Sequence, residues 1–146
     1  MCNKEVPQKK EKIRLYLEKG YNINRQFCSD NKTKEDAQYI DIKHRSCGST
    51  ILMEVCNTGD LDTVKFLVEN GANVNIRDFN GNNAAIHTLW YDDCKGKDID
   101  NRVDIVYYLI DHGLDEDNQN ALLEYIENGT IELDLIKEHM DLYLDR

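Results

Sequence analysis

The chain has 146 residues, of which 40% are hydrophobic and 8% aromatic, and its formal net charge is −10 at pH 7. This length and composition predict one globular domain with a buried core rather than a disordered chain. The acidic balance argues against a nucleic-acid binder, which needs a basic surface, and against binding to an anionic membrane. There is no apolar run near the roughly 18 residues of a membrane span, and the N-terminus is charged, so we expect a cytoplasmic protein.

The charge divides unevenly along the chain. Residues 1–25 hold seven Lys and Arg against three Asp and Glu, whereas residues 92–146 hold five against sixteen. The acidic half is either a solvated surface or a device that steers the chain toward a basic partner.

The cysteines form an odd set whose spacing follows no disulfide pattern. We therefore expect free thiols in a reducing compartment. These cysteines are Cys2, Cys28, Cys47, Cys56 and Cys94.

Residues 10–26 look like the second half of a unit that recurs further along the chain. The apolar spacing predicts a helix that ends at Gly20. Residues 27–46 are then an insertion, polar at first, which predicts a loop, and alternating at 39–42, which predicts an extended strand. We expect residues 1–47 to be a partial N-terminal repeat plus this insertion. The helix face is formed by Ile13, Leu15, Tyr16 and Leu17.

The clearest unit lies between Gly48 and Gly81, which are 33 residues apart. Thr50 is a candidate helix cap before a short apolar helix, the dipeptide at 59–60 breaks the chain, and a second apolar helix ends at Gly71. The residues up to Gly81 predict a turn-rich finger that projects to the next unit. The two helix faces are formed by Ile51, Leu52, Val55 and Cys56, and by Leu61, Val64, Leu67 and Val68.

This unit resembles an ankyrin repeat. Gly71–Asn75 (GANVN) matches the family's GADVN, and Gly59–Leu67 (GDLDTVKFL) matches its second-helix pattern GDLEVVKLL. The first-helix pattern TPLHxAA appears as Thr50–Cys56 (TILMEVC), without the proline or the histidine. The resemblance implies an all-α solenoid of helix-turn-helix units with about three to four repeats and short hairpin fingers. Such units become stable by stacking on their neighbours.

The remaining chain contains two further units within the single domain of residues 1–146. Residues 48–80 form the first complete repeat, and residues 81–117 form a repeat with a lengthened loop between its helices. Residues 118–146 are expected to be a C-terminal capping repeat, preceded by a largely deleted finger. The expected apolar positions are Ala84, Ala85, Thr88, Leu89, Val103, Val106, Leu109 and Ile110, then Ala121, Leu122, Tyr125, Ile126, Leu133, Ile136, Met140 and Leu144.

Enzyme motifs are missing from the sequence: there is no Gly-rich phosphate loop, no Gly-x-Ser-x-Gly and no His-Glu-x-x-His. We therefore expect no enzyme activity, no cofactor and no metal. One alternative stays open, in which the inserted loops form a metal-binding or enzymatic site. Its ligands would be His44 and Cys47, together with Cys28, Cys56 or Cys94.

The ankyrin resemblance also implies where a partner binds, because fingers and one face of the first helices contact partners in such proteins. Aromatic and arginine side chains dominate binding hot spots. Trp90 is either partner-facing or covered by the loop at 92–101, and nearby Asp92 and Asp93 would form a negative rim. The candidate contact residues are His44, Ser46, Cys47, Ser49, Asn57 and Thr58, then Arg77, Phe79, Asn80, Asn82, Trp90, Tyr91, Asp92 and Asp93.

The predicted function is that of a small acidic interaction protein, monomeric outside its complex, which binds and inhibits one protein with a basic surface. By resemblance, one candidate is an immunity-type protein that neutralises a toxin. The other is a viral or effector ankyrin protein that antagonises a host factor.

Overall fold

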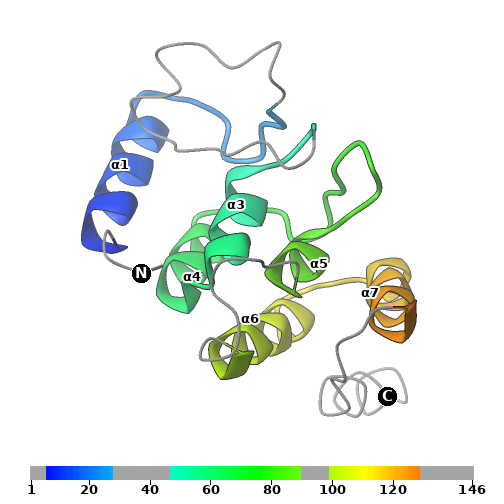
Figure 1. Cartoon of the computed structure of the whole chain (residues 1–146). Coiled ribbons are helices and arrows are strands. Elements are labelled where there is room, and N and C mark those ends of the chain that lie inside the picture. Colours follow the sequence, from blue (N-terminus) through cyan, green and yellow to red (C-terminus); the bar gives the residue numbers. More distant parts are fainter. Residues whose placement is uncertain (1–5, 28–46, 90–98, 129–146) are drawn as a thin grey trace.

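The structure is a computed structural model, and it describes residues 6–27, 47–89 and 99–128 (Figure 1). These ranges hold six α-helices and no β-strand, which confirms the all-α prediction. The predicted extended segment at 39–42 and the final helix after Ile131 lie outside the described residues. The helices are α1 (Val6–Glu18), α3 (Ile51–Thr58), α4 (Leu61–Glu69), α5 (Ala84–Leu89), α6 (Ile99–Asp111) and α7 (Glu116–Asn128).

The helices stack in two rows (Figure 1). In the inner row α5 packs between α3 and α7, and in the outer row α4 packs between α1 and α6. The rows are joined by α3 packing on α4 and α5 on α6. Lys10 of α1 adds an ion pair with Asp62 of α4 at the N-terminal end of the stack. Each helix is too short to be stable alone, so these contacts between units hold the fold together.

The helix ends form as the residue pattern predicts. The Thr50 side chain accepts a hydrogen bond of 3.2 Å from the Met53 N–H at the start of α3. In return the Thr50 N–H contacts the Met53 sulfur at 3.4 Å. Methionine stands here where the family pattern has histidine, so the thioether supplies a weak acceptor at this position. Gly59 then ends α3 in the left-handed conformation, with φ +78°.

The core is formed largely by the apolar faces that the sequence predicts, but the assignment of Leu15 to the apolar face of α1 is wrong, because Leu15 is 43% exposed. Leu67 of α4, Cys56 of α3 and Leu109 of α6 are completely buried, among others. Burial also extends to polar residues outside the apolar pattern. Every residue of α5 is buried, because this helix packs against α3, α6 and α7. His87 of α5 and Arg102 of α6 are examples of such polar residues, and Arg102 donates a 2.8 Å hydrogen bond to the Thr88 carbonyl.

Successive units are tied together by a ladder of asparagine side chains. Asn24 donates to the Gly71 carbonyl at 3.3 Å and accepts from the Asn73 N–H at 2.7 Å. One unit later, Asn75 makes the same pair of contacts, donating to the Gly113 carbonyl at 2.9 Å and accepting from the Asp115 N–H at 2.8 Å. The asparagine at the end of one loop therefore fixes the start of the next, which keeps the units in register.

The fourth unit departs from the pattern at its first helix. Alignment with α3 predicts an apolar helix beginning near Ala121, but α7 begins at Glu116, two residues after Leu114. Asp115 accepts a hydrogen bond of 2.9 Å from the Asn118 N–H and so caps the helix. An added helical turn thus occupies the place of the deleted finger, and it faces the preceding finger.

Candidate interaction surface

The finger between Gly71 and Gly81 is held rigid by one buried carboxylate. Asp78 is 4% exposed, and one of its oxygens accepts from the Asn80 and Asn82 N–H groups, each at 2.9 Å. Its other oxygen lies 2.8 Å from the His87 Nε2 of α5. The turn of the finger is therefore closed on itself and docked to the inner row of helices.

This arrangement leaves Phe79 at the tip of the finger, where 68% of the residue is exposed. The Phe79 N–H donates a 2.9 Å hydrogen bond to the Cys47 carbonyl, so the backbone beneath the ring is fixed against the neighbouring loop. Gly48 lies under the ring: a Cβ there would lie 2.7 Å from the ring Cδ1 and 2.8 Å from the Phe79 nitrogen. A large apolar side chain is thus held in the solvent by a rigid support.

Arg77 lies two residues before Phe79 and points toward the fourth unit. Its Nε donates a 2.8 Å hydrogen bond to the Asn118 side-chain oxygen, and its backbone carbonyl accepts from the Gln26 amide, also at 2.8 Å. Asn118 is only 3% exposed, and its own amide group donates to Asn75 and Asp115. The guanidinium is therefore positioned by a buried polar network.

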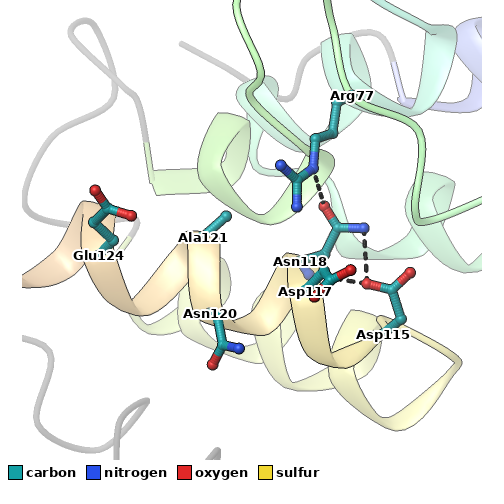
Figure 2. A pocket seen from close by; sticks show the side chains of 7 residues that line it. All are labelled: Arg77, Asp115, Asp117, Asn118, Asn120, Ala121 and Glu124. Atoms are coloured by element: carbon teal, nitrogen blue, oxygen red, sulfur yellow. Dashed lines mark hydrogen bonds between the residues drawn. The ribbon is translucent and has the colours of Figure 1, made fainter.

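Beside Arg77 lies an open hollow of about 550 Å³, shown in Figure 2, between the finger and α7. Sequence reasoning missed it, because it treated the fourth unit as a cap without contact residues. A spacing of i, i+4 and i+7 on α7 could have identified it, since such residues share one helix face. The hollow is lined by Arg77, Asp115, Asp117, Asn118, Asn120, Ala121 and Glu124.

The predicted contact residues fall into three groups. Arg77, Phe79 and Asn80 are exposed on the finger, and Asn82 is half-buried beside them. Asn57 and Thr58 are half-buried at the end of α3, where Asn57 donates a 3.2 Å hydrogen bond to the His87 carbonyl. The candidates His44, Ser46, Trp90, Tyr91, Asp92 and Asp93 lie outside the described residues, as does the question of whether Trp90 is covered.

One candidate needs correction. Ser49 has 0% exposure and takes part in the bridge to Phe27, accepting the Phe27 N–H through its carbonyl at 2.8 Å. A completely buried side chain cannot contact a partner, so Ser49 drops out of the candidate surface. No local pattern in the sequence indicates this burial, because it depends on the backbone bridge between Ser49 and Phe27.

The described cysteines differ from expectation in one respect. Cys47 is disulfide-bonded, so the prediction of a free thiol at this position is wrong. A disulfide sulfur is not a metal ligand, which weakens the alternative of a zinc site at His44 and Cys47. Cys56 is free and buried, and burial raises its pKa to about 12. A thiol with that pKa stays protonated and is a poor metal ligand at neutral pH.

No three His, Cys, Asp or Glu side chains within the described ranges are grouped as a metal ion would require. None of the described helices is both long and apolar enough to span a membrane.

A search of curated protein sequences finds no significant match to the chain. A family model for ankyrin repeats, in three copies, matches residues 8–120, which is most of the chain and covers α3 to α6 completely. The chain therefore belongs to the ankyrin-repeat family, whose repeats serve as protein–protein interaction modules.

Proposed function

We propose that the protein binds one partner protein through the finger and the adjacent inner face, and that it inhibits this partner. The observation that carries the proposal is Phe79, which is 68% exposed on a backbone fixed by the Cys47 carbonyl and by Asp78. A rigid exposed aromatic loses little conformational entropy on binding and buries a large apolar area. The proposed partner-facing set is then Arg77, Phe79 and Asn80, with Asn57 and Asn82. The predicted contact residues outside the described ranges stay part of the proposal: His44, Ser46, Trp90, Tyr91, Asp92 and Asp93.

The acidity of the chain supports a partner with a basic surface. The net charge of −10 would accelerate association with such a partner through long-range attraction. An immunity-type role, in which a monomeric binder neutralises a toxic protein, fits a small domain that acts by occlusion. Raising the salt concentration should then slow association more than it speeds dissociation.

The test is capture of the partner from a lysate of the source organism, followed by affinity measurement. Phe79→Ala should weaken binding by about 2 kcal/mol or more if Phe79 is a hot spot. Leu15→Ala is the matched control, because Leu15 is the other large hydrophobic residue that is exposed within the described ranges, at 43%, and it lies on α1. Equal affinities for the Phe79 variant and the wild type would overturn the proposed surface. A captured partner that keeps its activity when bound would contradict the inhibitory role.

A further inference from the structure

The hollow beside Arg77 has a chemistry of its own. Figure 2 shows Arg77 reaching down from the finger to Asn118, while Ala121 and Glu124 follow along α7 away from it. Asp117, Ala121 and Glu124 are spaced at i, i+4 and i+7, so they lie on one face of the helix over two turns. A small methyl group therefore forms the floor between two carboxylates.

The charges of the hollow are not neutralised internally. Its lining holds three carboxylates, from Asp115, Asp117 and Glu124, against the single guanidinium of Arg77. Within the described residues no ion pair joins Arg77 to any of the three, because its Nε is bonded to Asn118 instead. The hollow thus presents a net negative charge and an accessible guanidinium at one end.

The hollow also lies beside the proposed anchor. Arg77 and Phe79 are two residues apart, so their Cα atoms are at most about 7 Å from each other. A partner segment that contacts the Phe79 ring over Gly48 is therefore close enough to reach the hollow at Arg77 with a neighbouring side chain. The partner's side chain at this point would have to match the negative charge.

We propose that the hollow receives a lysine or arginine side chain of the partner protein. The charged head lies between Asp117 and Glu124, and the aliphatic stem covers Ala121. Arg77 then donates to a carbonyl oxygen of the same segment through its terminal nitrogens. This inference rests on the proposed function and assigns the chemistry of one contact in it.

Other occupants fit the lining less well. An apolar side chain would find only Ala121 as an apolar contact and would desolvate three carboxylates. A phosphate or carboxylate would gain Arg77 but would meet three like charges. A basic side chain fits this lining better, because its cationic head can pair with the carboxylates while its long apolar stem covers Ala121.

The test uses a defined probe and needs no identified partner. The peptide N-acetyl-Gly-Arg-Gly-amide is titrated into ¹⁵N-labelled protein, and the backbone amide of Ala121 and the side-chain amide of Asn118 are followed by NMR. The same peptide with citrulline in place of arginine is the neutral, nearly isosteric control. We expect saturable shifts with arginine at millimolar concentrations and none with citrulline.

The matched variants are Asp117→Asn with Glu124→Gln, compared with Asp104→Asn on α6. Asp104 is exposed and acidic but does not line the hollow. Removing both carboxylates should weaken arginine-peptide binding by about threefold to tenfold, since an exposed ion pair contributes modestly. Asp104→Asn should change it by less than about 1.5-fold, because distant exposed charges are screened. Equal shifts with citrulline, or equal losses in the two variants, would overturn the proposal.

The two proposals fail in different ways. Peptide binding that depends on Asp117 and Glu124, together with unchanged partner capture by Phe79→Ala, would support the hollow and refute the Phe79 anchor. Loss of capture in Phe79→Ala without any peptide shift at Ala121 would support the anchor and refute the basic occupant.

Discussion

Asn75 offers a direct test of how the repeats are coupled. Its side chain makes three hydrogen bonds across a unit boundary: to the Gly113 carbonyl at 2.9 Å, from the Asp115 N–H at 2.8 Å and from the Asn118 amide at 3.1 Å. Asn75→Ala removes all three. The change removes no residue of the apolar core, because Asn75 is polar and half-buried.

The magnitude follows from the number of bonds and their exposure. A hydrogen bond of this kind contributes about 0.5–1.5 kcal/mol, and the lower half of that range applies where water can replace the lost partner. Asn75→Ala should therefore lower the free energy of unfolding by about 1.5–3 kcal/mol. Asn24→Ala, which removes two equivalent bonds, should cost about 1–2 kcal/mol.

Urea denaturation followed by far-UV circular dichroism measures these differences. Asn73→Ala is the matched control, since the Asn73 side chain accepts only the Asn75 N–H, at 2.9 Å, inside the same loop. The expected order of destabilisation is Asn75, then Asn24, then Asn73. If Asn75→Ala were no more destabilising than Asn73→Ala, the ladder would not be the coupling between units.

Three further changes test the core and the finger. Leu67→Ala should cost about 2–5 kcal/mol by opening a cavity, and an unchanged melting curve would refute the core assignment. Gly48→Ala should displace the Phe79 ring and destabilise the loop, because its φ is +90° and a Cβ would clash with that ring; unaltered binding would contradict the rigid support. Burial raises the pKa of the Cys56 thiol from its ordinary value of 9.0 to about 12 in the folded protein. The free energy of unfolding should therefore not depend on this thiol below pH 9, and it should fall by about 1.4 kcal/mol per pH unit from pH 9 to pH 12. A shallower slope in Cys56→Ala would support this, and thiol labelling of native Cys56 at pH 8 would contradict it.

Most of the helices could be predicted from the sequence because their signals are local. The faces of α3 and α4 repeat every three or four residues, and Thr50 and Gly71 mark a beginning and an end. The start of α7 was missed because residues 116–120 are polar and give no apolar periodicity. Asp115 followed by two acidic residues in the first turn is nonetheless a helix-start signal that could have placed it.

The candidate surface was less predictable for a physical reason. Exposure of Phe79 follows from its place in a turn, but burial of Ser49 depends on its bridge to Phe27, which lies 22 residues earlier. The position of Arg77 likewise depends on Asn118, 41 residues later. Contacts between distant segments leave no periodic trace in the sequence, so they emerge only from the assembled stack.

The position of the asparagine ladder has a consequence for how the chain tolerates change. The ladder joins residues 22–24 to 71–75 and these to 113–118, all of which lie outside the insertion predicted at 27–46 and the loop predicted at 92–101. The two ends of the first insertion are held together by a hydrogen bond of 2.7 Å, which the Gly48 N–H donates to the Phe27 carbonyl. Lengthening a loop between fixed ends costs little entropy. The length of the insertion after Phe27 can therefore vary while the unit-to-unit register stays unchanged, so this scaffold is suited to carrying loops of different lengths at that position.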